Sequence, residues 1–514
     1  MKSEWNYVKS IIIVVLLITT LPYFINYLQT PKGAAYTGMP AIHSSDMYIY
    51  ISWIQQIKEG AIFLHNTFTQ EHGYPFLNPF FLLGGILIKF LNLPNIIGYH
   101  FLRISAITAS LMIFFLFIKT YLTTTRERII ALCLIGFSGG LWAPGEWLTE
   151  HSIFLEFYEN ALHTFALGVI TLFSYIYVKK PKYYLYYLTI LANILILSHS
   201  YDVVIIFGIV LTHLLADTIV HRKLNLGLVR DNMFLLLFSL PSVLYMGYLV
   251  THDLILKQGV TLSSKAYIFP VYFAVYGVLA ILAAIGVYIA RSQLKNRYLF
   301  VASWLLTYPL IIYIPIPFAL SFAFRLVLGW QIPMAIFAAL AVETIYQKAT
   351  TTKSSKKGVL VIATILILSS GNNLAFLFQD IWDANRNRTT PYYIPADYMR
   401  AFQWIDKNTK NKEIFFGDFY TCYFLTALAG NRVYWGNIYQ TYKLKEKEKA
   451  AQPFFSTTPN AGKSFLHSNN LSYVIIGPWE NTHFKGSINE LGKIVKKSGD
   501  VTIIKVPVMR SFED

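Results

Sequence analysis

The sequence predicts a polytopic α-helical membrane protein that ends in a C-terminal extracytoplasmic α/β domain. Of its 514 residues, 55% are hydrophobic and only 14% are charged, and the mean hydropathy is +0.46. Soluble globular domains are less apolar and carry more charge. Apolar runs close to the ~20 residues that cross a bilayer core recur at 11–27, 101–121, 203–220, 233–250, 271–290, 301–315, 326–342 and 359–378.

The first apolar run, 11–27, has no small-residue cleavage site after it, so we expect an uncleaved signal-anchor. Six clusters of lysine and arginine lie along the chain, the first of them before this run. The positive-inside rule places all six in the cytoplasm, which predicts about eleven spans, a cytoplasmic N-terminus and an external C-terminal region. The short segment 79–93, which contains Gly84, Gly85 and Lys89, is assigned to the first external loop as an interfacial or re-entrant helix.

The net charge of +16 resides largely in these cytoplasmic clusters. Anionic lipid headgroups explain such clusters, and we therefore expect no nucleic acid among the partners. The only two cysteines, Cys133 and Cys422, fall in different regions, which argues against a disulfide framework.

The predicted topology gathers titratable residues on the outer face. The long first external loop, 28–100, begins with an unusually polar and aromatic segment around Asp46. The second external loop, 144–162, is acidic. The residues that stand out near this face are His43, Asp46, Tyr50, Glu150, His151, His163, His199, Asp202 and Arg325. Titratable groups that converge at a membrane surface are candidates for an active site.

Each of these residues also has a simpler structural interpretation, and those of Asp46 and Arg325 are the most specific. Asp46 follows two serines and precedes an apolar-periodic stretch, which is typical of an N-cap for a helix that starts at Met47. Arg325 sits at the outer end of an apolar run, where a long cationic side chain can extend to lipid headgroups.

From about residue 379 the apolar runs shorten and the charge rises. We divide the chain into a membrane module, 1–378, and an external α/β domain, 379–514. The domain is predicted to bind the acceptor or to cover the site. Its expected strands are 413–419, 432–435, 472–477 and 502–508, and its expected helices are 395–408 and 440–455.

Six segments of the chain are distinctive: SSDMYIYISWIQQIKEG, EHGYPFLNPFFLLG, NALHTFAL, SHSYDVVI, FRLVLGWQIPMAI and RVYWGNIYQTYKLKEKEKAAQPFF. They resemble a prokaryotic branch of the glycosyltransferase-C superfamily, which also contains oligosaccharyltransferases, protein O-mannosyltransferases and lipid A aminoarabinose transferases. The order of signal-anchor, first loop with an early Asp, paired spans, acidic second loop and external domain also resembles this superfamily. The paired DxD or ExD signature of the family is absent, because Met47 and Tyr48 follow Asp46.

The resemblance implies inverting transfer of a sugar from a polyprenyl-phosphate donor to a glycan, lipid or protein acceptor on the outer face. Asp46 and Glu150 are the catalytic candidates, and Asp46 is the favoured general base. Arg325 suits the lipid phosphate. The other expected substrate contacts are His43, Tyr50, His163, His199 and Asp202. A divalent cation, Mg²⁺ or Mn²⁺, is a further expectation, with Asp46, Glu150 and His151 as candidate ligands.

Two other functions fit parts of the sequence. A transporter or flippase of lipid-linked glycans would carry its charged groups near the bilayer midplane and often has repeated halves. Here the predicted ionisable residues lie at the outer surface, and no halves repeat. The other alternative is a non-catalytic protein of cell-envelope assembly, which the missing DxD signature leaves open.

Overall fold

The computed structural model describes residues 2–40, 44–140, 149–261, 269–313, 325–350, 355–409, 413–456 and 459–507. The chain forms two compact units. Unit 1 comprises Met1–Ile25, His100–Gly247 and Ser263–Trp382, and unit 2 comprises Asn26–Tyr99, Tyr248–Leu262 and Asp383–Asp514. Almost all of the segment predicted as the first external loop, 28–100, therefore belongs to the same compact unit as the C-terminal region.

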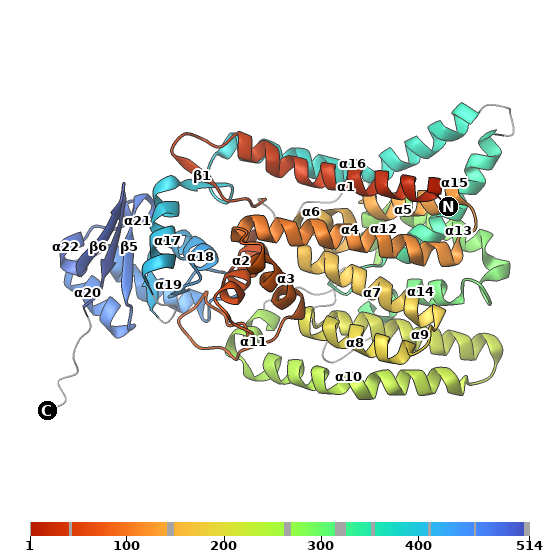
Figure 1. Cartoon of the computed structure of the whole chain (residues 1–514), viewed down its shortest axis with the longest axis horizontal. Helices are drawn as coiled ribbons and strands as arrows, with labels where there is room; N and C mark the ends of the chain where they lie inside the picture. The colour runs from red at the N-terminus through yellow and green to blue at the C-terminus, as the bar shows by residue number, and fades with distance from the viewer. Residues whose placement is uncertain are drawn as a thin grey trace. The chain divides into compact units, whose positions relative to one another are not determined.

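The described part of unit 1 is a bundle of helices (Figure 1). Four helices, α1, α4, α10 and α16, continue a short way into unit 2. The helices are α1 (Lys2–Leu28), α4 (Asn95–Tyr121), α5 (Thr125–Phe137), η2 (Thr149–His151), α6 (Ile153–Glu159), α7 (Ala161–Lys179), α8 (Tyr184–Ser198), α9 (Asp202–His221), α10 (Leu226–His252), α12 (Phe269–Tyr276), α13 (Val278–Ile289), η3 (Arg291–Gln293), α14 (Leu299–Tyr313), α15 (Gln331–Thr350) and α16 (Ser355–Asn387).

Among the described residues, six helices are long and apolar enough to cross a membrane. They are α1, α4, α7, α9, α10 and α16. Shorter apolar helices, among them α8, α13 and α14, accompany them. Because each long helix satisfies its backbone hydrogen bonds internally, it can lie in lipid. The prediction of a polytopic α-helical membrane protein is confirmed.

Two predicted apolar runs are not single helices. The run 271–290 is divided into α12 and α13 at Gly277, whose φ of 48° lies in the left-handed region that favours glycine. The run 326–342 does not become helical until Gln331, because Gly329 takes a φ of 87° in the preceding turn. Arg325 thus lies in a turn before α15 and not at the end of a span.

A fully buried arginine ties three helices of unit 1 together. Arg103 of α4 donates to the carbonyl oxygens of Thr19 in α1, at 3.2 Å, and of Phe157 in α6, at 2.9 Å. Its guanidinium also lies 4.9 Å from the ring centre of Tyr23. A buried charge is stabilised by such contacts only when its donors find acceptors, so Arg103 fixes where α6 lies against α1 and α4.

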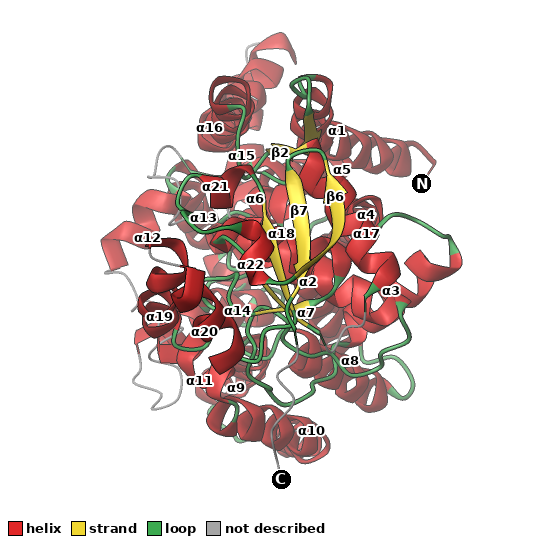
Figure 2. Ribbon diagram, turned by 90° about the vertical axis from the view of Figure 1, so that its left-hand side faces the viewer, coloured by secondary structure: helices red, strands yellow, loops and turns green. Residues whose placement is uncertain are grey.

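Unit 2 combines helices with two small sheets (Figure 2). The five-stranded sheet has the order β4-β3-β5-β7-β6, in which β3 is parallel to β4 and β5 while β7 is antiparallel to β5 and β6. Strands β1 and β2 form a separate antiparallel pair. The elements are β1 (Ala34–Tyr36), α2 (Ser44–Lys58), α3 (Pro79–Phe90), α11 (Leu254–Thr261), β2 (Tyr393–Pro395), α17 (Ala396–Asn408), β3 (Ile414–Phe416), α18 (Phe419–Ala429), β4 (Arg432–Val433), α19 (Leu444–Ser456), α20 (Pro459–Ser468), β5 (Tyr473–Ile476), α21 (Pro478–Asn481), α22 (Ile488–Leu491), β6 (Lys493–Ser498) and β7 (Val501–Lys505).

The α/β character of the C-terminal region is confirmed. Each of the four predicted strands overlaps an observed one, and the two predicted helices correspond to α17 and α19. Strand β6 was not predicted, because its sequence KIVKKS is rich in lysine. It is an edge strand, and lysines on an edge discourage pairing with other chains.

The segment predicted to remain outside the bilayer core forms α3, which has only 12 residues. Such a helix is about 18 Å long, less than the thickness of a bilayer core. Its buried side, including Phe81 and Ile88, packs in unit 2, while Leu83, Ile86 and Phe90 are exposed. An exposed apolar side on a short helix fits the predicted interfacial position.

We predict that Arg103→Met destabilises the protein. The substitution leaves the Thr19 and Phe157 carbonyls buried without their donor, a loss of about 2–4 kcal/mol. Thermal unfolding in detergent should show an apparent melting temperature several degrees lower. The exposed Arg291 provides a matched control. Equal melting temperatures for Arg103→Met and Arg291→Met would contradict this role.

Candidate functional site

The second predicted loop is not a solvated loop where the structure describes it. All seven residues of α6 are buried. The side-chain amide of Gln331, 1% exposed, accepts from the backbone N–H of Ile153 at 3.0 Å and donates to the carbonyl oxygens of Leu134, Ile135 and Ser138. The Tyr158 hydroxyl donates to the carboxylate of Asp380 at 2.6 Å. These hydrogen bonds to the Ile153 N–H and to Tyr158 help this acidic segment to lie inside the helix bundle.

Glu150 and Arg325 form an ion pair at one side of this segment. The Arg325 Nε atom lies 3.6 Å from Glu150 Oε1, and the guanidinium lies 6.0 Å from the ring centre of Tyr201. The turn that carries Arg325 is held by the Tyr308 hydroxyl, which donates to the carbonyl oxygen of Leu328 at 2.9 Å. The Arg325 side chain is 32% exposed and that of Glu150 is 11% exposed, so part of the Arg325 side chain is open to solvent.

His163 forms a second pair, with Glu156. Asn160 ends α6 and caps α7 by accepting from the backbone N–H groups of Leu162 and His163. This break places His163 Nδ1 2.9 Å from Glu156 Oε2. The other ring nitrogen, Nε2, lies 3.4 Å from the hydroxyl of Tyr201. A carboxylate on one nitrogen of an imidazole fixes its orientation and directs the other nitrogen at a partner.

The third pair joins the end of α8 to the start of α9. His199 Nδ1 lies 2.6 Å from Asp202 Oδ2, and both side chains are buried. The ring centres of His163 and His199 are 4.4 Å apart, and that of Tyr201 is 4.1 Å from His199. The pairs Glu150–Arg325, Glu156–His163 and His199–Asp202 therefore meet around Tyr201, and we call these residues the unit 1 polar cluster.

The sequence predicted five of the seven cluster residues as site residues; Glu156 and Tyr201 were not among them. The structure brings together Glu150, His163, His199, Asp202 and Arg325. Tyr201 was overlooked because the chain has 36 tyrosines, which are common at membrane interfaces. Its position between His199 and Asp202 was the available signal.

The other predicted residues lie elsewhere. Asp46 is in unit 2, in the first turn of α2, which begins at Ser44 and not at Met47; Asp46 is therefore inside the helix and is not its N-cap. It is partly exposed. Tyr50 is 6% exposed and stacks on Phe81 at 4.9 Å, so it contributes to packing. His43 lies outside the described residues.

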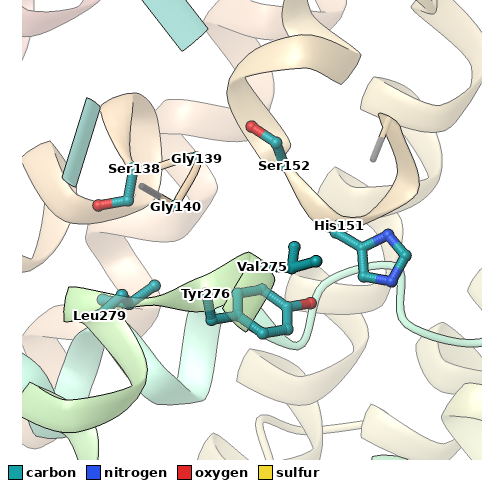
Figure 3. A pocket seen from close by; sticks show the side chains of 8 residues that line it. All are labelled: Ser138, Gly139, Gly140, His151, Ser152, Val275, Tyr276 and Leu279. Atoms are coloured by element: carbon teal, nitrogen blue, oxygen red, sulfur yellow. The ribbon is translucent and has the colours of Figure 1, made fainter. Parts of the chain in front are cut away.

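His151 occupies a small enclosed pocket of unit 1 (Figure 3). Its ring stacks on Tyr272 at 5.3 Å, and Figure 3 shows the Tyr276 hydroxyl pointing toward the His151 side of the pocket. Neither ring nitrogen has a hydrogen-bond partner among the described residues. Burial lowers the pKa of His151 to about 3, so the ring is neutral at physiological pH. The lining residues are Ser138, Gly139, Gly140, His151, Ser152, Val275, Tyr276 and Leu279.

The described residues do not form a metal site by themselves. Within the ranges that the structure describes, no three His, Cys, Asp or Glu side chains are grouped closely enough to hold a metal ion. Of the candidate ligands, Glu150 pairs with Arg325, His151 faces its own pocket, and Asp46 belongs to the other unit. The chemical step proposed below does not involve a metal ion.

No protein-family model and no curated protein sequence matches this chain. Several solved structures do. The oligosaccharyltransferase of Archaeoglobus fulgidus, tethered with an acceptor peptide, is 14% identical; the match covers 92% of this chain and 69% of that one, with a TM-score of 0.52. ArnT from Cupriavidus metallidurans, bound to undecaprenyl phosphate, is 9% identical over 96% and 97% of the two chains, with a TM-score of 0.53. The mycobacterial arabinofuranosyltransferase AftD is 10% identical over 96% and 41%, also with a TM-score of 0.53.

The chain has the glycosyltransferase-C fold. At these identities the likeness concerns the fold, and it confirms the resemblance that the sequence segments predicted. The residues of the unit 1 polar cluster are therefore interpreted from their own geometry in this chain.

We predict that His151→Phe reduces the sensitivity of the protein to acid. In the unfolded chain the imidazole takes up a proton near its ordinary pKa of about 6.5, whereas the folded protein resists protonation down to pH about 3. Wild-type stability should therefore fall as the pH drops below about 6.5, by up to ~1.4 kcal/mol per pH unit from this residue.

Melting temperatures in detergent at pH 7.5 and pH 5 measure the effect. The phenylalanine variant should lose less stability between the two values than wild type, and it keeps an aromatic ring against Tyr272. His467→Phe, at a partly exposed position in unit 2, is the control. An acid-induced loss that is unchanged in His151→Phe would refute the buried neutral imidazole.

Proposed function

We propose that the chain is a membrane glycosyltransferase that moves a sugar from a polyprenyl-phosphate donor to an acceptor on the outer face of the membrane, with inversion. The observation that carries the proposal is the unit 1 polar cluster, in which the partly exposed Arg325 lies beside two buried carboxylate–histidine pairs. The glycosyltransferase-C fold supports it. So does ArnT, a protein of this fold whose structure was determined with undecaprenyl phosphate.

Arg325 is proposed to bind the lipid phosphate. It is the most exposed of the six side chains in the three pairs, at 32% against 11% or less for the others. Its guanidinium offers parallel donors that match phosphate oxygens. In the donor-free protein Glu150 holds the guanidinium in place, and a phosphate oxygen would replace or join this carboxylate.

The buried pairs are proposed to keep the cluster rigid and close to neutral. His163 and His199 each orient toward one carboxylate, so the partial charges near Arg325 are fixed before a substrate arrives. Preorganised dipoles and charges of this kind stabilise a developing phosphate charge without a reorganisation cost. Tyr201, which contacts both histidines and lies 6.0 Å from the Arg325 guanidinium, is proposed to transmit this order to the guanidinium.

Asp46 is proposed as the general base. In the step, the acceptor oxygen attacks the anomeric carbon and its proton passes to the Asp46 carboxylate. The bond between the anomeric carbon and the phosphate oxygen breaks, and the lipid phosphate leaves with the electron pair. A partly exposed carboxylate suits this role because an acceptor can reach it.

Replacing the base should nearly abolish transfer. We expect Asp46→Asn to lower kcat by about 10²–10⁴-fold, the usual contribution of a general base. The assay follows sugar transfer or hydrolysis from a panel of short-chain polyprenyl-phospho-sugars in detergent. Asp500→Asn, at an exposed turn of the same unit, is the control. Retention of wild-type turnover by Asp46→Asn would exclude Asp46 as the base. Donor binding without turnover in either protein would favour a flippase or an assembly protein, and an arm with EDTA tests the expected Mg²⁺ or Mn²⁺.

Replacing the proposed phosphate ligand should also weaken transfer, but with a distinct pattern. Arg325→Met removes both charge and donors, and we expect a loss of about 10²–10³-fold in kcat/KM. Arg325→Lys keeps the charge without the planar pair of donors, so it should restore only part of the activity. Arg291→Met serves as the exposed control. If Lys and Met behave alike at near wild-type rates, Arg325 does not bind the phosphate.

A further inference from the structure

A second cavity, of about 800 Å³, lies within unit 2. Its volume falls in the range of sites for small molecules, about 300–1,000 Å³. No part of the proposed transfer chemistry uses it. We call it the sheet-end cavity, and its lining residues are Asp418, Phe419, Trp435, Glu448, Gln452, Phe455, Thr482, His483 and Lys485.

The cavity sits at the carboxyl ends of the three parallel strands. Asp418 follows β3, Trp435 follows β4, and Thr482, His483 and Lys485 follow β5 after the short helix α21. From β3 the chain turns toward β4, whereas from β5 it continues to β6 and β7 on the other side. Adjacent parallel strands whose connections leave in opposite directions open a crevice at their carboxyl ends, and ligands of α/β sheets bind there.

The walls of the cavity are preformed by the buried carboxylate of Glu480. One of its oxygens accepts from the backbone N–H of Asp418 at 2.7 Å, and the other accepts from Gly477 at 2.9 Å and from the Tyr398 hydroxyl at 2.6 Å. Glu480 thereby ties the loop after β3 to the loop after β5. Just after β4, Trp435 Nε1 donates to the carbonyl oxygen of Gly417, which follows β3, at 3.0 Å. A site held in this way loses little freedom when a ligand binds.

The lining combines aromatic rings with groups that donate and accept hydrogen bonds. Trp435 and Phe455 lie parallel, with an interplanar angle of 4° and ring centres 6.5 Å apart. Around the rings stand two carboxylates, an amide, a hydroxyl, an imidazole and an ammonium, from Asp418, Glu448, Gln452, Thr482, His483 and Lys485. With His483 counted as neutral, the two carboxylates and the one ammonium give the lining a formal charge of only −1.

This chemistry selects among ligand classes. A nucleotide or free phosphate needs a cluster of positive groups or backbone N–H donors, and the two carboxylates oppose it. A lipid chain makes no use of the polar groups, which it would desolvate. A saccharide offers apolar C–H faces to the rings and hydroxyl groups that both donate to carboxylates and accept from Lys485 and His483.

We propose that the sheet-end cavity binds a neutral oligosaccharide. Its Trp435, Phe419 and Phe455 side chains pack against sugar rings, and the polar groups at the rim bind their hydroxyls. The proposal does not rest on the proposed transferase function, because binding at this cavity needs no chemistry at the unit 1 polar cluster. The two claims can therefore fail separately.

The test uses the full-length protein in detergent and measures binding directly. Saturation-transfer NMR screens neutral oligosaccharides of glucose, galactose, mannose and N-acetylglucosamine, and calorimetry gives the Kd of the tightest. We expect Glu448→Gln and Lys485→Met each to raise Kd about tenfold, the effect of losing one charge-assisted hydrogen bond. Both residues are exposed, so the variants should fold as wild type does.

A matched control lies on the same helix. Glu446 is two residues before Glu448 on α19, is exposed, and pairs with Lys443 away from the cavity lining. Glu446→Gln should leave Kd unchanged. The proposal is overturned if no oligosaccharide of the panel binds, if binding is equal in Glu448→Gln, Lys485→Met and wild type, or if a peptide library binds the cavity in their place. Transfer activity, measured on the same samples, reports separately on the proposed function.

Discussion

The arrangement of unit 1 depends on the burial of an acidic segment, 149–159, inside a helix bundle that is otherwise apolar. Glu156 and Glu159 on this segment are buried, and so is His151. Burying such groups is costly unless each finds a partner. Gln331 and Arg103 form hydrogen bonds with backbone groups of the segment, and Asp380 accepts a hydrogen bond from the Tyr158 hydroxyl. His163 pairs with Glu156. Without these polar contacts the segment would be more stable in solvent than inside the bundle. Glu150, which lies on the segment, would then leave its position beside Arg325.

The burial of this segment explains which features of the site could be predicted from the sequence and which could not. Titratable residues are rare in a chain that is 14% charged, so each one near the predicted outer face was conspicuous, and Glu150, His163, His199, Asp202 and Arg325 could be selected. Their pairing was not predictable. The Glu156–His163 contact depends on the break at Asn160, where α6 ends and α7 begins in a new direction. Hydrophobic periodicity carries no information about such a break.

Prediction of the fold succeeded and failed for equally physical reasons. The long apolar helices and the strands of the α/β region follow from apolar length and alternation, which tertiary contacts do not override. Gly277 and Gly329 interrupted two expected helices, because positive φ is a property of one residue that a window average hides. Strand β6 was missed because its lysines suit an edge position that only the finished sheet defines. Tyr50, predicted as a substrate contact, stacks on Phe81 and so also packs α2 on α3.

The most direct test of this account is a structure of the protein with a non-transferable polyprenyl-phosphonate analogue of the donor, determined by electron cryomicroscopy. The account predicts phosphonate oxygens at about 2.7–3.0 Å from the Arg325 guanidinium, with Glu150 still close and the Glu156–His163 and His199–Asp202 pairs unchanged. A phosphonate held by other cationic residues, with Arg325 still paired only to Glu150, would contradict the role given to the unit 1 polar cluster.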